Sequence, residues 1–365
     1  MATTHFFPQD IITDILKRLL VKSLIRFQCV CKHWRHLLKT PSFVAENLRH
    51  STHQNSVLLF QGYRLFDPSG WCFLDHEMQV QSAPEIGSLL GVRIVGAING
   101  LLCFRPDNAS IFLWNPAIRQ FHCYRIARIH VSVNSRVISS EECLLDTNLV
   151  NEVHVYSLST GSWKGIEFGN LNGVSLMSNG LHAIGSIFWF GFMLNVGEED
   201  ENDGHLVVSF DIATEVFTLI PLPTSAPKSY RNRLSVHENK LAMLSHTPVG
   251  NSESSVIDLW VMEEGTGVSG ERWNWTKKYS SRPYPFLLNP GSIWRNEIVC
   301  IFLWIGTERE RNRSKGKVVL FNITANKIKM LATPKYGDGD GLFFNYVESL
   351  VPVGNDHIEE FDPRS

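Results

Sequence analysis

The sequence predicts an α+β protein of two parts, a small N-terminal helical module followed by a large all-β, propeller-like domain of six or seven blades. Three observations support this prediction. Helical spacing of apolar residues is confined to residues 1–50, alternating apolar runs fill the remainder, and one hairpin pattern recurs along the alternating part. A chain of 365 residues is long enough for one such module and one large domain.

The helical module begins at Pro8, a residue suited to the first turn of a helix. Apolar residues follow at the spacing of one helical face, at Ile11, Ile12, Ile15, Leu16 and Leu19. Further short amphipathic segments run from Ser23, from Val30 and from Pro41. Helices this short display more apolar side chains than their own core can bury, which indicates a binding surface for partner helices. The alternative is that they simply pack on the rest of the chain.

The segment FPQDIITDILKRLLVKSLIRFQCVCKHWRHLLKTPSFV (7–44) closely resembles the F-box motif, especially that of its large plant branch. The resemblance implies a module that binds a Skp-type adaptor and, through it, a cullin. It implies that the adaptor-binding residues are Pro8, Ile11, Ile12, Ile15, Leu16, Leu19, Leu24, Val30, Cys31 and Trp34. Phe7 and Leu20 depart from the usual Leu and Pro, and both keep apolar character, so we expect altered helix ends and retained binding.

One hairpin pattern recurs in the β part. An alternating strand ends in an aromatic residue, a polar turn-former follows, and another large apolar residue stands seven positions after the aromatic. The four copies are IFLWNPAIRQF (111–121), VHVYSLSTGSW (153–163), VVSFDIATEVF (207–217) and VVLFNITANKI (318–328). A looser copy, VIDLWVMEE (256–264), has its return strand near Trp273 and Trp275.

A second set of strands lies between these hairpins, so that pairing the two sets gives four strands a unit. The turns of this set are expected near Asn99-Gly100, Asn179-Gly180, Asn239 and Asn296. The spacing of the repeated aromatics is close to the period of propeller blades, roughly 40–50 residues. A ring of blades also buries the ten Trp and 22 Phe of the chain between sheets. An irregular β-sandwich is the alternative architecture.

The same segments, with INGLLCF (98–104) and the terminal YVESLV (346–351), resemble the F-box-associated, kelch-like domain of plant F-box proteins. Residues 123–152 depart from that pattern. The resemblance therefore does not define the blade that they would form, and the total is expected to be six or seven. The resemblance implies an F-box over 1–50, a substrate-recognition domain over 55–353 and a flexible tail over 354–365. Because ring ends must be tied together to cover sheet edges, we expect the segments 56–60 and 345–351 to share a blade.

Composition points to an intracellular protein that binds neither nucleic acid nor membranes. The net charge is -2, and although residues 1–50 hold eight Lys and Arg against three Asp and Glu, neither part is basic enough for a nucleic-acid surface. The apolar runs are too short for a membrane span or a secretory signal. Seven cysteines, an odd number set mostly in apolar runs, indicate reduced thiols in the cytoplasm or the nucleus.

No catalytic motif, metal-ligand cluster or cofactor site is predicted, so the chain is expected not to be an enzyme. His182, His237 and His246 stand on or near predicted strands and are expected to have surface or turn roles. Target contact is expected in loops of the β part. The candidates are the acidic run 198–203 and, in the basic run 308–317, Arg309, Arg311 and Arg313.

The resemblance therefore implies a substrate-recognition subunit of a Skp-cullin-F-box E3 ubiquitin ligase, with the adaptor on the F-box and an unknown protein target on the β-domain. Two alternatives remain open at this point. The chain could bind the adaptor or sequester targets without degrading them, or it could be a propeller enzyme with residues gathered on its axis.

Overall fold

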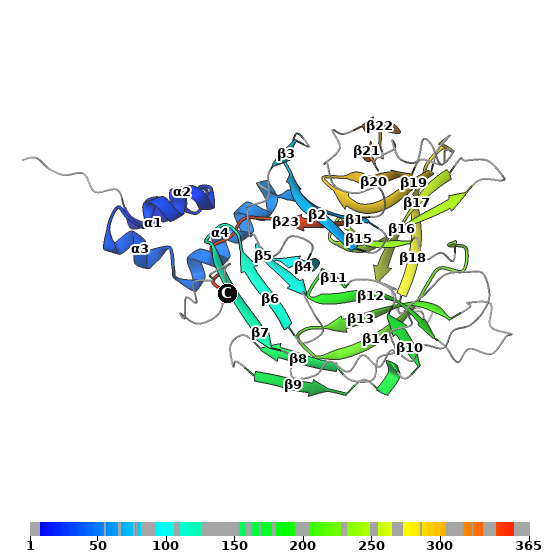
Figure 1. The fold of residues 1–365 in the computed structure, drawn as a ribbon, viewed down its shortest axis with the longest axis horizontal. Helices are drawn as coiled ribbons and strands as arrows, with labels where there is room; N and C mark the ends of the chain where they lie inside the picture. Colours follow the sequence, from blue (N-terminus) through cyan, green and yellow to red (C-terminus); the bar gives the residue numbers. More distant parts are fainter. Residues whose placement is uncertain are drawn as a thin grey trace, which may run out of the picture. The chain divides into compact units, whose positions relative to one another are not determined.

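Figure 1 shows the fold in a computed structural model. The structure describes residues 8–54, 56–64, 67–75, 77, 79–81, 92–105, 110–125, 153–157, 162–167, 169–171, 173–176, 180–193, 204–227, 232–248, 255–264, 273–284, 287–303, 317–322, 324–330 and 341–353. They belong to two compact units. The first combines described residues of 1–61, 70–126 and 343–365, and the second those of 62–69 and 127–342.

Four helices open the first unit. Their bounds are α1 (Gln9–Leu16), α2 (Val21–Phe27), α3 (Lys32–Leu37) and α4 (Pro41–Gln54). The carbonyl of Pro8 accepts hydrogen bonds from the amides of Ile11 and Ile12 at 3.1 and 3.2 Å, which confirms that proline opens the first helix. The expected third helix begins at Lys32 and not at Val30, because Cys31 has extended backbone and caps α3.

The helices share one hydrophobic core. Its buried members are Leu16, Val21, Leu24, Leu38, Phe43, Val44 and, from the other end of the chain, Leu350. Asn47 of α4 is buried and donates to the carbonyl oxygens of Lys17 and Leu19 at 3.0 and 3.4 Å, which satisfies the open C-terminal end of α1. The helical module is therefore held both by apolar burial and by a buried side-chain cap.

Two four-stranded sheets make up most of the rest of the first unit, in the orders β23-β1-β2-β3 and β4-β5-β6-β7. The bounds are β1 (Val57–Arg64), β2 (Asp67–Leu74), β3 (Val80–Gln81), β23 (Gly341–Tyr346), β4 (Arg93–Ile98), β5 (Leu101–Arg105), β6 (Ser110–Asn115) and β7 (Gln120–Arg125). Both sheets contribute to one aromatic core, where Trp71 lies 5.8 Å from Trp114 and 6.0 Å from Phe104 between ring centroids.

The second unit contains three larger sheets and one pair of strands. Their orders are β10-β12-β13-β14 with β11 on β12, β15-β16-β17-β18, β19-β20-β21-β22, and β8-β9. The bounds are β8 (Val153–Ser157), β9 (Ser162–Ile166), η1 (Gly169–Leu171), β10 (Val174–Leu176), β11 (Leu181–Ala183), β12 (Ser186–Met193), β13 (His205–Asp211), β14 (Val216–Pro221), β15 (Arg233–His237), β16 (Lys240–Pro248), β17 (Ser255–Glu264), β18 (Trp273–Ser280), β19 (Leu287–Trp294), β20 (Glu297–Leu303), β21 (Lys317–Asn322) and β22 (Lys327–Met330).

The recurring hairpins have the register that the sequence predicts. In every copy, the aromatic residue and the apolar residue seven positions later are direct partners across the two strands. The pairs are Trp114 with Phe121, Tyr156 with Trp163, Phe210 with Phe217 and Phe321 with Ile328. The looser copy is also confirmed, because the late return strand β18 pairs Trp275 with Met262 of β17.

The polar turn-formers act as expected where the turn is described. The side-chain oxygens of Asn115, Asp211 and Asn322 accept backbone amide hydrogen bonds two or three residues on, at 3.0, 2.7 and 2.7 Å. In the second set of hairpins one turn was not predicted. It lies between β11 and β12 at Ile184-Gly185, both with positive φ, whereas β11 begins at Leu181, directly after the expected turn signal.

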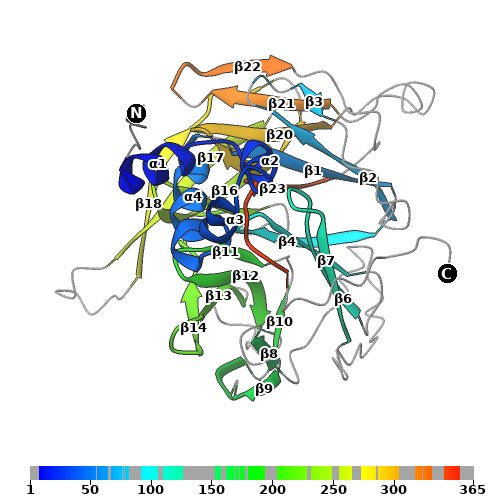
Figure 2. The same ribbon diagram turned by 90° about the vertical axis from the view of Figure 1, so that its left-hand side faces the viewer.

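The two ends of the β part share a sheet, as expected, because β23 is the neighbour of β1. The strand lies earlier in the sequence than predicted, at Gly341–Tyr346 and not at 345–351. It ends at Tyr346, and residues 347–351 continue without strand pairing. Figure 2 shows the corresponding red segment leaving β23 and passing beside the helices. This segment supplies Leu350 to the helical core.

We expect Leu16→Ala to lower the free energy of unfolding of the helical module by about 2–5 kcal/mol, because Leu16 is only 2 % exposed and its truncation leaves a cavity. The neighbouring variant Ile15→Ala is the matched control, since Ile15 is 54 % exposed and should change stability by less than about 0.5 kcal/mol. Hydrogen exchange of the α1 and α2 amides measures both. Equal effects of the two variants would contradict the assignment of the buried face.

Candidate protein-binding surface

The helical module carries a concentration of exposed apolar side chains. Nine large apolar residues are exposed among those that the structure describes, and four of them lie between positions 11 and 30. These are Ile11, Ile15, Leu20 and Val30, with exposed fractions of 46, 54, 54 and 62 %. An apolar surface of this kind on a small module marks a site of protein association.

The surface arises because α1 is apolar on more than one face. Ile12 and Leu16 pack into the shared core, whereas Ile11 and Ile15, four positions apart, lie together on an exposed face. Leu20 stands at the turn before α2 and adds a third exposed apolar side chain. The sequence alone could not separate these faces, since neighbouring isoleucines at i and i+1 satisfy the same helical pattern.

Val30, Cys31 and Trp34 form a second part of the surface around the start of α3. The amide of Trp34 donates to Cys31 Sγ at 3.4 Å, so the thiol caps the helix. The half-buried Trp34 ring packs against Phe27 with centroids 5.6 Å apart. Val30 and Cys31 themselves are exposed.

Exposed basic side chains lie on the same helices and turns as the apolar residues, and we refer to them as the basic rim. Exposed cations on α2, α3 and the turn after α3 are Lys22, Arg26, Lys32, Arg35 and Lys39. On α1, Asp14 pairs with Lys17 at 2.7 Å and with Arg18 at 2.8 Å. The Lys17 ammonium holds the pKa of Asp14 below its usual value, against an opposite effect of burial, and Arg18 adds to the lowering. An apolar centre with a cationic rim is suited to an acidic partner.

The ten residues predicted for adaptor binding fall into three groups. Pro8, Ile11, Ile15, Val30 and Cys31 are exposed, Ile12, Leu19 and Trp34 are partly buried, and Leu16 and Leu24 are buried. Leu20 was missing from the prediction, although its exposure equals that of Ile15. Its departure from proline was the signal that could have identified it. Arg309, Arg311, Arg313 and the acidic run 198–203 lie outside the described residues.

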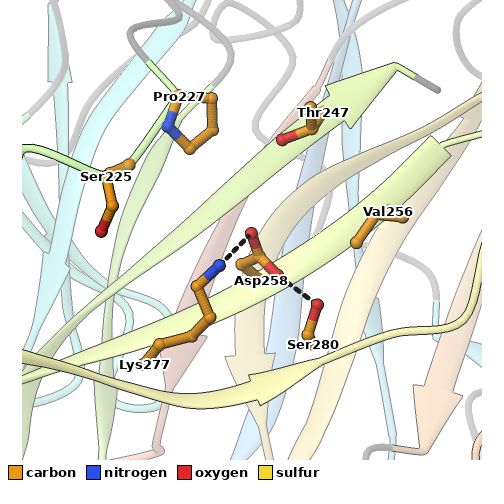
Figure 3. A pocket seen from close by; sticks show the side chains of 8 residues that line it. Ser225, Pro227, Thr247, Val256, Asp258, Lys277 and Ser280 are labelled. Atoms are coloured by element: carbon orange, nitrogen blue, oxygen red, sulfur yellow. Dashed lines mark hydrogen bonds and ion pairs between the residues drawn. The ribbon is translucent and has the colours of Figure 1, made fainter. Parts of the chain in front are cut away.

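A shallow pocket of about 390 Å³ with a mixed polar and apolar lining opens on the sheet β15-β18 (Figure 3). Its lining residues are Ser225, Ala226, Pro227, Thr247, Val256, Asp258, Lys277 and Ser280. The Asp258 carboxylate accepts from Ser280 Oγ at 2.6 Å and from Lys277 Nζ at 3.2 Å, and Lys277 also lies 4.7 Å from the Trp260 ring centroid. The pocket can therefore bind a polar group, but its carboxylate is already engaged.

The described residues show little that resembles catalytic chemistry. No three His, Cys, Asp or Glu side chains among them are placed to hold a metal ion. Burial raises the pKa of Cys72 to about 12 and that of Cys103 to about 11, which keeps both thiols protonated and unreactive. His182 lies on β11, and partial burial of its imidazole lowers its pKa below the usual value. Within the described residues no helix is long and apolar enough to span a membrane.

Two family models match the chain. The model described as "F-box domain" matches residues 6–45, and the model described as "F-box associated beta propeller domain" matches residues 75–353. The predicted fold class is thus confirmed, with a small helical F-box before a large all-β propeller. The described residues form five blades of four or five strands, whereas six or seven were predicted. The strand pair β8-β9 forms a sheet of its own, and residues 126–152, where the sequence departs from the family pattern, lie outside the described part.

Several curated relatives from Arabidopsis thaliana resemble the chain over most of its length. One F-box/kelch-repeat protein is 25% identical over 83% of this chain and 86% of its own length, and another is 26% identical over 80% of each. Among solved structures, the tricorn protease aligns with a TM-score of 0.36 at 12% identity, over 76% of this chain and 31% of the protease. With its two domains matched in order, the chain belongs to the family of F-box proteins that carry an F-box associated beta propeller domain.

Proposed function

We propose that this chain is the substrate-recognition subunit of a Skp-cullin-F-box E3 ubiquitin ligase. In this proposal the F-box binds a Skp-type adaptor, the adaptor connects to a cullin, and the propeller holds a protein target. The observation that carries the proposal is the exposed apolar surface of α1 and of the turns before α2 and α3, on a module matched as an F-box. The propeller match and the F-box relatives support the same role.

The adaptor would cover the exposed residues and leave the buried ones as their support. Ile11, Ile15, Leu20 and Val30 supply direct apolar contacts, with Trp34 beside them as a half-buried anchor. Leu16 and Leu24 act from beneath, by fixing the helices that present these side chains. The basic rim favours an adaptor face that is acidic, which would raise the association rate and fix the orientation.

In this mechanism the chain has no catalytic residue of its own. It raises the concentration of the target near the conjugating enzyme, so that catalysis is positional. We propose an F-box over 1–50 and a recognition domain over 55–353, whereas the suggested tail 354–365 lies outside the described residues. The cytoplasm or the nucleus is the proposed location, which suits the exposed cysteines Cys29 and Cys31, neither of which forms a disulfide.

The double variant Ile11→Ser with Ile15→Ser should weaken binding of a recombinant Skp-type adaptor at least tenfold, because two exposed apolar contacts of roughly 1–2 kcal/mol each are removed. The matched control is Ile184→Ser with Ile212→Ser, since these propeller isoleucines are 58 and 45 % exposed and lie outside the F-box. Calorimetric titration with the adaptor gives both affinities, and thermal unfolding checks that the two proteins remain equally stable.

Equal adaptor affinity of the two double variants would contradict the proposal that the exposed face of α1 binds the adaptor. Co-purification from plant cells then separates the remaining possibilities. Recovery of a cullin with the wild-type chain and its loss with the α1 variant support a ligase subunit. Recovery of the adaptor without a cullin supports an adaptor-bound protein that does not direct degradation.

Target binding is expected to involve the basic run that contains Arg309, Arg311 and Arg313. Reversing these three charges to Glu should slow association with a co-purified target and reduce its dependence on ionic strength, because exposed charges steer encounter. Thermal stability should change little. Recovery of the target is measured at two salt concentrations. If the variant recovers as much target as the wild type at both salt concentrations, this run is a solvated loop without a role in target binding. Target contact would then lie in other parts of the propeller.

A further inference from the structure

We propose that the C-terminal segment Val347–Val353 is an integral part of the adaptor-binding module, and that it holds the F-box helices in the arrangement that binds the adaptor. This inference rests on the proposed adaptor binding and adds a positioning role for residues some three hundred positions away in sequence. Its consequence is that the F-box is competent only in a chain whose C-terminal end is in place.

The segment completes the hydrophobic core of the helices. Leu350 is 6 % exposed and belongs to the same buried cluster as Leu16 and Leu24, and Val351 packs at the edge of this cluster. A helical module of this size buries too little apolar surface to be stable by itself. Removing Leu350 would therefore uncover the side chains that support the exposed face of α1.

Asn115, at the end of β6, fixes the path of the segment. Its side-chain amide donates to the carbonyl oxygens of Ser349 and Val351 at 3.1 and 2.8 Å, and the whole residue is buried. Its side-chain oxygen accepts from the amide of Ala117 at 3.0 Å. The side-chain nitrogen of Asn115 thus binds the C-terminal segment, and its side-chain oxygen binds the turn after β6. One side chain therefore holds both.

The turn held by Asn115 also reaches the helices. Ala117 and Ile118 are partly buried against the same cluster as Leu350. The C-terminal segment and this propeller turn therefore contact the F-box core together. In the corresponding turn after β13, Ile212 is 45 % exposed. The apolar turn after β6 is thus used as a support for the helices.

Two further contacts hold the segment on the propeller side. Ser349 Oγ donates to the carbonyl oxygen of Asn99 at 2.6 Å, and the amide of Val353 donates to Gln120 Oε1 at 3.1 Å. Gly100 has a φ of +80°, and a Cβ there would overlap the Ser349 side chain and lie 2.8 Å from the carbonyl oxygen of Val347. The segment thus approaches so closely that only glycine fits at this turn.

The segment follows β23 directly, the strand that joins the end of the propeller to β1. Tyr346, the last residue of β23, is buried in the aromatic core with Trp71 and Trp114. The position of Leu350 is therefore set by pairing of the last strand with the first. A chain that ends before residue 347, or whose last strand is displaced, keeps every F-box residue but loses the support of its helices.

Gly100→Ala tests the inference without changing a residue of the F-box or of the segment. Gly185→Ala is its matched control, because Gly185 also has positive φ at a hairpin turn but has open space where the Cβ would stand. Both variants carry the same backbone strain. We expect Gly100→Ala to weaken adaptor binding at least tenfold and to raise hydrogen exchange of the α1 and α2 amides, while Gly185→Ala does neither.

Leu350 supplies the second comparison. Leu350→Ala should act in the same direction as Gly100→Ala, Leu350→Met should retain binding, and Pro352→Ala, at an exposed position of the segment, should behave as wild type. Across these variants, the loss of adaptor affinity should increase with the fraction of molecules in which α1 and α2 are open, as measured by hydrogen exchange. The reason is that the adaptor binds only the ordered module. Saturating adaptor should restore helix protection, while exchange in β12 and β16 stays at the wild-type level.

Wild-type adaptor affinity in both Gly100→Ala and Leu350→Ala would overturn the inference and leave the proposed function intact. If the wild-type chain binds no Skp-type adaptor, the proposed function fails. Hydrogen exchange then still tests whether the C-terminal segment orders α1 and α2. Unchanged helix exchange in both variants would overturn the structural part of the inference as well.

Discussion

One shared hydrophobic core, built from both ends of the chain, is the constraint on which the rest of the structure depends. The F-box helices need Leu350 to complete the burial of Leu16 and Leu24, and Leu350 is held in place by Asn115 of the propeller. The buried face of α1 fixes the direction in which Ile11 and Ile15 are presented. Adaptor recognition and propeller closure are therefore properties of one packed unit.

The sequence predicts the local parts of this fold well, because they depend on short-range chemistry. A hairpin register follows from an aromatic residue, an Asx turn and an apolar residue seven positions on, as Phe210, Asp211 and Phe217 show. The turn at Ile184-Gly185 was not predicted, because a β-branched residue is a poor candidate for positive φ. Here the pairing of β11 with β12 decided the turn.

The sequence identifies most apolar residues of the helical module but not their arrangement. Helical spacing selects Ile11, Ile12, Ile15 and Leu16 together, and only packing shows that Ile12 and Leu16 turn inward. The support from residues 347–353 has no sequence signal, since contacts between Asn115 and Val351 join positions 236 apart. Residues 347–351 were assigned to the closing strand because a ring of blades must tie its ends together. In the structure Leu350 and Val351 instead contact the helices.

This architecture also accounts for the apolar residues that the F-box leaves exposed. Four large apolar side chains within twenty positions add little to the stability of the free chain and favour association with any apolar surface. Such a surface is tolerable where a partner covers it for most of the protein's lifetime, and the surrounding cations limit self-association by like-charge repulsion. The other five exposed large apolar residues of the described chain are spread over the β part, from Val80 to Val216. The density of exposed apolar side chains therefore distinguishes the F-box as the surface that most needs a partner.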